Sequence, residues 1–234
     1  MKLSRDQQQD FNDKSWDWAL RTGREELGNL EVNLRFLEQT QLLHRGMKVI
    51  ELGCGTGSLA DALYQKGVDI AACDVSEVAI GRAKEKYPHL DLSAQSAERL
   101  PWPDEHFDAV LSFDVLEHLF EPDQHLSEVR RILKPGGYYL FQTPNKWVNA
   151  MYETMKTRSL AWRQYHPSLH CAGRLKRRLA KHSFESRFIK MNTVNAFTLR
   201  KLENYPRLRK WLGRLNFQRL PLWMQTNFYV IAKK

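Results

Sequence analysis

Cysteine is scarce in this sequence, and long apolar runs are missing. The chain has 234 residues and three cysteines, and no CxxC or zinc-ligand spacing occurs among them. This composition argues against a disulfide framework and for a reducing compartment. No stretch approaches the roughly 20 apolar residues that span a bilayer, and the first residues have no apolar core of the kind found in secretory signals. We therefore expect a cytoplasmic protein with one sizeable core.

Acidic residues are almost missing from the last third of the chain. Residues 160–234 contain 17 lysines and arginines but only Glu185 and Glu203, whereas residues 1–159 contain 19 basic and 25 acidic residues. The net charge of +9 therefore comes from a basic C-terminal part joined to a mildly acidic remainder. Such an asymmetry concerns the partners of a protein more than its fold.

The glycine-rich segment of the chain lacks the residues that bind phosphate groups. Residues 49–57 read Val-Ile-Glu-Leu-Gly-Cys-Gly-Thr-Gly, an apolar strand followed by three glycines at alternate positions. A P-loop would continue with Gly-Lys-Ser/Thr, and the dinucleotide fingerprint would have a glycine in place of Ser58. The carboxylate of Glu51 would also repel a pyrophosphate. The segment therefore predicts a nucleoside ligand that carries positive charge and no phosphate.

An acid follows the next predicted strand. Asp74 comes directly after residues 68–73, and a carboxylate there can accept hydrogen bonds from both hydroxyls of a ribose. The glycines permit a tight turn and the close approach of a ligand. S-adenosylmethionine, which has a sulfonium and an ammonium group, matches the chemistry of Glu51 and Asp74 together.

Predicted strands and helices alternate through the chain, as in a doubly wound α/β fold. Apolar runs typical of buried parallel strands predict strands at 48–52, 68–73, 90–94, 107–113 and 138–143. Two further strands are expected at 184–191 and 226–232. Helices are predicted at 58–65, 77–86, 122–133 and 175–182.

The pattern Glu-x-Gly-x-Gly-x-Gly with a downstream Asp resembles the class I S-adenosylmethionine-dependent methyltransferases. Residues 96–102, 114–119 and 133–137 resemble three further blocks of that superfamily, although Ser96 stands where many relatives carry an acid for the adenine amino group. The resemblance implies a Rossmann-like methyltransferase fold with a mixed seven-stranded sheet and an antiparallel edge. It implies S-adenosylmethionine as cofactor, S-adenosylhomocysteine as product, and cofactor contacts from Glu51, Gly53, Cys54, Gly55, Asp74, Val75, Ser96, Ala97 and Phe113.

Within the superfamily the chain is most similar to the O-methyltransferases of ubiquinone biosynthesis. Residues 16–18, Gly23 and 33–35 carry this similarity, with one residue between two tryptophans that are adjacent in the family. The resemblance implies that Arg35 binds the carboxylate of the cofactor, as a guanidinium group does well. It also implies a divalent cation held by Asp114, Glu117 and His118. The alternative is that Glu117 and His118 cap a helix start.

The resemblance also suggests how a single domain, residues 1–234, is divided. Residues 1–45 are expected to form an N-terminal helical cap, 46–145 the cofactor-binding core, 146–182 the acceptor-site lid and a helix, and 183–234 the sheet edge with a basic segment. Large apolar side chains suggest that the lid is helical: Trp147, Met151, Tyr152, Met155, Trp162 and Tyr165. A hydroxyl acceptor must lose its proton, and His118, His166 and His170 are the candidate bases.

Residues 206–221 combine an apolar stripe with basic residues. A helix there would place Leu208, Trp211, Leu212 and Leu215 on one face and Arg207, Arg209, Lys210 and Arg214 on the other. A basic amphipathic helix with Trp at its boundary is typical of peripheral binding to an anionic membrane. A helix docked on the protein is the alternative, and nucleic acid is a third partner class for which no recognised motif is present.

The sequence therefore predicts a methyltransferase of a hydroxylated, apolar small molecule, such as a quinone precursor, at or near a membrane. A methyltransferase of a soluble metabolite or natural-product intermediate, and a non-catalytic cofactor-binding accessory protein, are the alternatives. The sequence does not predict an oligomeric state.

Overall fold

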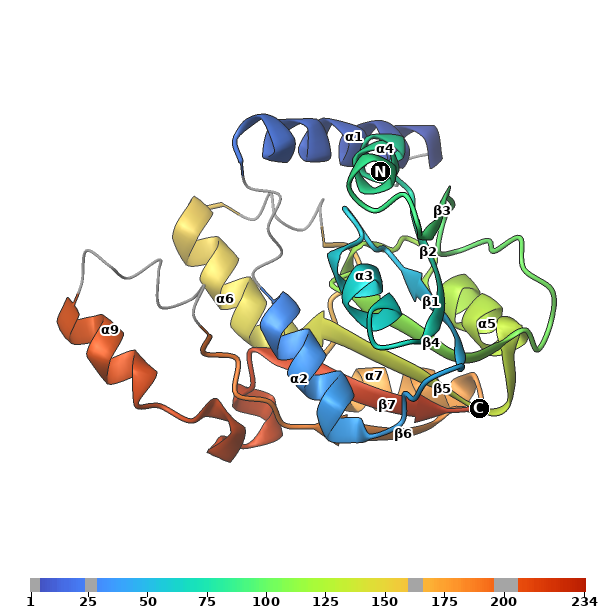
Figure 1. Cartoon of the computed structure of the whole chain (residues 1–234). Helices are drawn as coiled ribbons and strands as arrows, with labels where there is room; N and C mark the ends of the chain where they lie inside the picture. The colour runs from blue at the N-terminus through green and yellow to red at the C-terminus, as the bar shows by residue number, and fades with distance from the viewer. Residues whose placement is uncertain (1–4, 24–28, 160–165, 196–205) are drawn as a thin grey trace.

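A twisted seven-stranded sheet forms the centre of the computed structural model, which describes residues 5–23, 29–159, 166–195 and 206–234 (Figure 1). The strand order is β3-β2-β1-β4-β5-β7-β6. The strands are β1 (Lys48–Leu52), β2 (Asp69–Asp74), β3 (Asp91–Ala94), β4 (Phe107–Phe113), β5 (Leu133–Pro144), β6 (Glu185–Ile189) and β7 (Asn227–Lys233). β7 pairs antiparallel with β5 and β6, and the other neighbours pair parallel. The predicted mixed α/β fold is confirmed.

Helices cover both faces of this sheet. The described helices are α1 (Arg5–Arg21), α2 (Leu30–Thr40), α3 (Ser58–Tyr64), α4 (Glu77–Lys86), α5 (Pro122–Ile132), α6 (Lys146–Thr157), α7 (Ala172–Lys181) and α9 (Pro206–Gly213). Short 3-10 turns lie at Leu116–His118, Phe217–Arg219 and Leu222–Met224. None of the helices in these described ranges is long and apolar enough to cross a membrane.

The core has two layers because side chains alternate along each strand. In β1, Val49 packs with α2, α3 and α4 on one face, while Ile50 and Leu52 pack with α5 and α7 on the other. Both faces of the central strands are buried, which explains why these strands read as nearly continuous apolar runs.

Most elements lie within about three residues of their predicted bounds, and two differ by more. β5 begins at Leu133, before the Pro-Gly-Gly segment, because Leu133 already pairs with Phe107 and the register then shifts to Ala109 opposite Tyr138. A Cβ on Gly137 would lie 2.9 Å from the carbonyl oxygen of Asp108, so only glycine fits at this crossing. The helix expected over residues 206–221 ends at Gly213.

Helix α1 lies across the carboxyl ends of the first strands (Figure 1). Its sequence is polar, and two residues fix it to the core. Trp16 covers Gly55 of the glycine-rich turn, and Asp13 accepts hydrogen bonds from Ser76 and from the backbone N–H of Val78. The helix therefore closes one side of the region where ligands bind in open α/β sheets.

Candidate functional site

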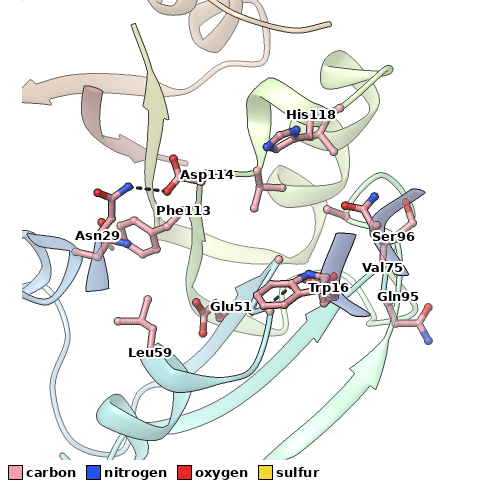
Figure 2. Close-up of a pocket in the computed structure, with 18 of the residues that line it drawn as sticks. Trp16, Asn29, Glu51, Leu59, Val75, Gln95, Ser96, Phe113, Asp114 and His118 are labelled. Atoms are coloured by element: carbon pink, nitrogen blue, oxygen red, sulfur yellow. Dashed lines mark hydrogen bonds between the residues drawn. The ribbon is translucent and has the colours of Figure 1, made fainter. Parts of the chain in front are cut away.

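A cavity of about 240 Å³ opens where β1, β2 and β4 end (Figure 2). Eight of the ten residues predicted to bind the cofactor line it: Glu51, Gly53, Gly55, Asp74, Val75, Ser96, Ala97 and Phe113. Asp114 and His118 line it as well. The cavity occupies the crevice at the carboxyl ends of parallel strands, which is the usual ligand site of such sheets.

The turn after β1 leaves no room for side chains. Gly53 and Gly55 have φ angles of +73° and +53°, in the left-handed region that glycine adopts without strain. A Cβ on Gly53 would lie 2.3 Å from Cγ2 of Val115, and one on Gly55 would lie 2.6 Å from Cζ2 of Trp16. The turn is therefore packed against β4 and α1, and its backbone forms part of the cavity wall.

Asp74 is held at the cavity by backbone hydrogen bonds. Its Oδ2 accepts from the N–H of Gly55 and its Oδ1 from the N–H of Ser76, both at 2.9 Å. Burial raises the pKa of this carboxyl, and the two N–H groups lower it in part. Each carboxylate oxygen can accept a further hydrogen bond. The side chain is therefore oriented, and it keeps acceptor capacity for hydroxyl groups in the cavity.

Glu51 is a buried acid beside Asp74. Burial raises its pKa to about 8, the N–H of Ala60 lowers it in part, and the charge of Asp74 raises it further. Its Oε2 is buried and has no hydrogen-bond partner among the described residues. Burial disfavours the ionised form of a carboxyl group, and a nearby cation favours it. A cationic ligand group would therefore stabilise the ionised form of Glu51. This orphaned oxygen fits the ammonium group of S-adenosylmethionine.

The loop after β3 forms the far end of the cavity, where Gln95, Ser96 and Ala97 line the wall. The carbonyl oxygen of Ala97 accepts a hydrogen bond from Nδ1 of His125 at 2.7 Å, and Nε2 of His125 accepts from the hydroxyl of Tyr139 at 2.9 Å. Burial lowers the pKa of His125 to about 4, so the ring is neutral and fits these two roles. A buried polar chain therefore fixes the loop that the resemblance assigns to the adenine ring.

Asp114 has an unusual backbone conformation at the end of β4. Its φ of +56° lies in the left-handed region, which is strained for a residue other than glycine. One carboxylate oxygen accepts from Nδ2 of Asn29 at 2.9 Å (Figure 2). The other accepts from Nε2 of Gln142 at 3.0 Å. These amide contacts hold the strained residue in place.

The structure does not bring Asp114, Glu117 and His118 together as metal ligands. Glu117 is 1 % exposed, and its Oε2 accepts from the hydroxyl of Thr143 at 2.9 Å. Burial and the neighbouring Asp114 charge raise the pKa of Glu117 well above its usual value. Within the described ranges, no group of three His, Cys, Asp or Glu side chains could hold a metal ion. The predicted divalent cation therefore has no support in this geometry.

Two of the candidate histidines face each other beside the cavity. His118 lines it, and the rings of His118 and His166 lie 4.9 Å apart between centroids. Burial, with a smaller effect of His118, lowers the pKa of His166 to about 4. Its ring is therefore neutral near pH 7. His170 does not line the cavity, and its Nε2 accepts from Nη1 of Arg178 at 3.0 Å.

Arg35 and Cys54 do not line the cavity. Nη2 of Arg35 donates to the carbonyl oxygen of Asn192 at 3.0 Å, whereas Asn33 faces the cavity from the same helix. Residues two apart on a helix point to nearly opposite sides, which is why Asn33 lines the cavity and Arg35 does not. The Cys54 side chain is fully buried, and burial raises the pKa of its thiol.

Several cavity residues were not among the predicted site residues: Asn12, Trp16, Asn29, Leu30, Asn33, Leu59, Gln95, Val115 and Leu119. Trp16 and Asn33 belong to the N-terminal motif that the sequence showed, and Gln95 immediately precedes a recognised block. Asn29 has no such signal, because it reaches Asp114 across 85 residues of sequence.

Comparisons with known proteins agree with the fold. Residues 50–141 match the family model described as a methyltransferase domain. A probable S-adenosylmethionine-dependent methyltransferase of Mycolicibacterium smegmatis is 37% identical over 108 residues, which cover 45% of this chain and 42% of that protein. A ubiquinone biosynthesis O-methyltransferase of Coxiella burnetii is 30% identical over 142 residues, which cover 58% of this chain and 60% of that protein. The chain therefore spans only about half the length of these curated relatives.

A solved structure shows the same fold over nearly the whole chain. It is an S-adenosylmethionine-dependent methyltransferase from Thermotoga maritima, described as a possible histamine N-methyltransferase. Its TM-score is 0.65 at 20% identity, and the match covers 94% of this chain and 97% of that one.

Proposed function

We propose that this chain, whose residues 50–141 match the model of a methyltransferase domain, is a class I S-adenosylmethionine-dependent methyltransferase that transfers a methyl group to a small-molecule acceptor. The observation that carries the proposal is the pair of buried carboxylates at the glycine turn. Asp74 is oriented by two backbone N–H groups, and Glu51 has an oxygen without a partner among the described residues. A nucleoside with a cationic tail satisfies both.

The residues around the cavity divide the cofactor among them. Asp74 would accept hydrogen bonds from the ribose hydroxyls, and Glu51 would bind the ammonium group. The loop at Ser96 and Ala97 would hold the adenine ring. Asn33 faces the cavity, and its Oδ1 accepts from the hydroxyl of Tyr229 at 3.1 Å. The N–H groups of its amide would therefore be directed to the carboxylate of the cofactor. When bound, S-adenosylmethionine supplies an electrophilic methyl carbon on a sulfonium.

The acceptor is proposed to be a hydroxyl of an apolar molecule, such as a quinone precursor. Three observations support this class. Phe113, Val115 and Leu119 give the cavity an apolar wall near His118. His166 is a neutral imidazole at pH 7 that can take up a proton. One relative is named as a ubiquinone biosynthesis O-methyltransferase, and the methylation of oxygen is carried over from it as a proposal.

The protein contributes position and proton transfer to such a reaction. A rigid glycine turn and a fixed Asp114 hold the two reactants close, and close positioning alone can lower a barrier by several kcal/mol. His118 or His166 would accept the hydroxyl proton of the acceptor, and transfer of the methyl group would leave S-adenosylhomocysteine as the product.

Removal of either histidine is expected to lower turnover more than cofactor affinity. We predict that His118→Ala and His166→Ala each reduce kcat by about 100-fold or more, the usual contribution of a positioned base, while the Kd for S-adenosylmethionine changes less than about threefold. His44→Ala, at an exposed site, is the matched control and should behave as wild type. Unchanged kcat in both histidine variants would rule out a base at this pair.

A labelled-methyl transfer assay tests the proposal itself. Hydroxylated apolar acceptors should become labelled, with His166→Ala as the low-activity control. Transfer only to soluble polar metabolites would show that the acceptor is a soluble metabolite and not an apolar molecule. Tight cofactor binding with no transfer to any acceptor would instead favour a cofactor-binding accessory protein.

A further inference from the structure

Helix α6 carries a stripe of large apolar side chains that faces solvent. Trp147, Met151 and Met155 are spaced four residues apart, so they lie along one side of the helix. Their exposed fractions are 64, 60 and 73 %. These residues were expected to cover the acceptor site, but none of them lines the cavity. Large exposed apolar side chains in a contiguous row are typical of an interaction site.

A second exposed apolar element adjoins the start of α6. The side-chain amide of Asn145 donates to the carbonyl oxygens of Trp223 and Gln225 at 2.8 and 2.9 Å, which fixes the 222–224 turn beside this helix. Trp223 is 67 % exposed. Of the nine large apolar side chains exposed in the described part of the chain, six form this surface, which we call the α6 surface: Trp147, Met151, Tyr152, Met155, Trp223 and Met224.

Basic residues lie on the same side of the molecule as the α6 surface (Figure 1). Nζ of Lys146 lies 5.7 Å from the centre of the Trp147 ring. Exposed basic residues follow at the end of α6 and along α9 and the turn after it: Arg158, Arg207, Lys210, Arg214 and Arg219. α6 follows the carboxyl end of β5, and α9 precedes the start of the antiparallel β7, which lies beside that end. Both helices therefore project from the same end of these strands (Figure 1). The acidic residue Glu185 lies opposite Lys233 in the β6–β7 pairing, at the other end of β7 and so away from the start of that strand.

We propose that the α6 surface docks on an anionic lipid bilayer. Trp and Met side chains would enter the headgroup region while the Lys and Arg side chains contact lipid phosphates. The charge favours this occupant over a second copy of the chain, because a second copy would bring the same basic surface into contact with itself. The sequence had assigned membrane contact to residues 206–221, whose side chains at 208, 211 and 212 lie outside those that the structure describes; the described exposed apolar residues lie on α6 and the 222–224 turn.

The cavity opens at the carboxyl edge of the same sheet, so docking would place it near the bilayer, from which an apolar acceptor would arrive. This consequence rests on the proposed methyl transfer, whereas the docking itself does not.

Vesicle co-sedimentation of the full chain tests the docking. Wild type should bind vesicles of phosphatidylcholine with phosphatidylglycerol, bind phosphatidylcholine alone much more weakly, and lose affinity as salt rises. The double variant Trp147→Ser with Met155→Ser should bind the anionic vesicles at least about 10-fold more weakly than wild type. Tyr64→Ser, which alters an exposed ring on α3, is the matched control and should bind as wild type.

Charge removal gives an independent arm. Arg207→Gln with Lys210→Gln should weaken binding about 10- to 30-fold and flatten its salt dependence, whereas Lys84→Gln with Lys86→Gln on α4 should change it little. Wild type that does not sediment with anionic vesicles would overturn the proposal. A serine double variant that binds as tightly as wild type would also overturn it. So would wild type that is a dimer in solution while the serine double variant is a monomer. Cofactor titration of the same variants separates the two proposals, because docking can fail while cofactor binding remains.

Discussion

Asp74→Ala is expected to lose at least about 100-fold in affinity for S-adenosylmethionine. Hydrogen bonds to a charged group contribute about 1.5–3 kcal/mol each, and this carboxylate is assigned two ribose hydroxyls. The substitution also removes the acceptor for the N–H groups of Gly55 and Ser76, which fix the glycine turn. Both effects reduce binding, so the loss should exceed that of any other single cavity substitution.

A matched variant separates this effect from general destabilisation. Asp69 begins the same strand and is exposed, so Asp69→Ala removes an acid from β2 at its other end. Isothermal titration should give wild-type affinity for Asp69→Ala, and circular dichroism should show both variants folded. Folded Asp74→Ala with near-normal affinity would mean that the ribose binds elsewhere.

Glu51→Gln is expected to weaken cofactor binding and to abolish the proton release that accompanies binding in wild type. With a pKa of about 8, Glu51 is mostly protonated at pH 7 in the free protein. A cationic ligand favours the ionised form and lowers this pKa, so binding should release up to about one proton. The glutamine variant lacks both the charge and the proton. Its affinity should fall about 10- to 100-fold, the contribution of one charge-assisted hydrogen bond.

Calorimetry in two buffers of different ionisation enthalpy measures this proton release. Wild type at pH 7 should show a binding enthalpy that depends on the buffer, and Glu51→Gln should not. Equal buffer dependence in both proteins would assign the proton to another group and contradict the role of Glu51.

The same acid makes the stability of the free protein depend on pH. The folded pKa of Glu51 is raised from 4.5 to about 8, so its contribution to stability is fully present below pH 4.5 and is lost as the pH rises toward 8. The loss approaches about 1.4 kcal/mol per pH unit inside this window. Relative to wild type, Glu51→Gln should therefore gain unfolding free energy between pH 5 and 8, which urea unfolding at several pH values would measure.

The sequence predicted the strands and the glycine turn well because local patterns determine them. Apolar runs place the strands, and the spacing of Gly53, Gly55 and Asp74 places three cavity residues at neighbouring strand ends. These features need only the periodicity of buried strands and the rule that ligands bind at their carboxyl ends.

Tertiary contacts determine what the sequence could not show. Arg35 carried the expected role in α2, but the direction of the helix turns Asn33 to the cavity instead. Asn29 meets Asp114 only after the chain folds. The apolar stripe of α6 was visible as a pattern, yet a pattern alone does not tell whether such a stripe faces the protein or the solvent.

Competitive calorimetry tests whether this cavity binds a cationic nucleoside without phosphate. Wild type should bind S-adenosylmethionine and S-adenosylhomocysteine with micromolar-range affinity, and neither NAD nor ATP should bind or compete. Binding of NAD or ATP in this cavity, or no binding of S-adenosylmethionine by folded protein, would contradict the account.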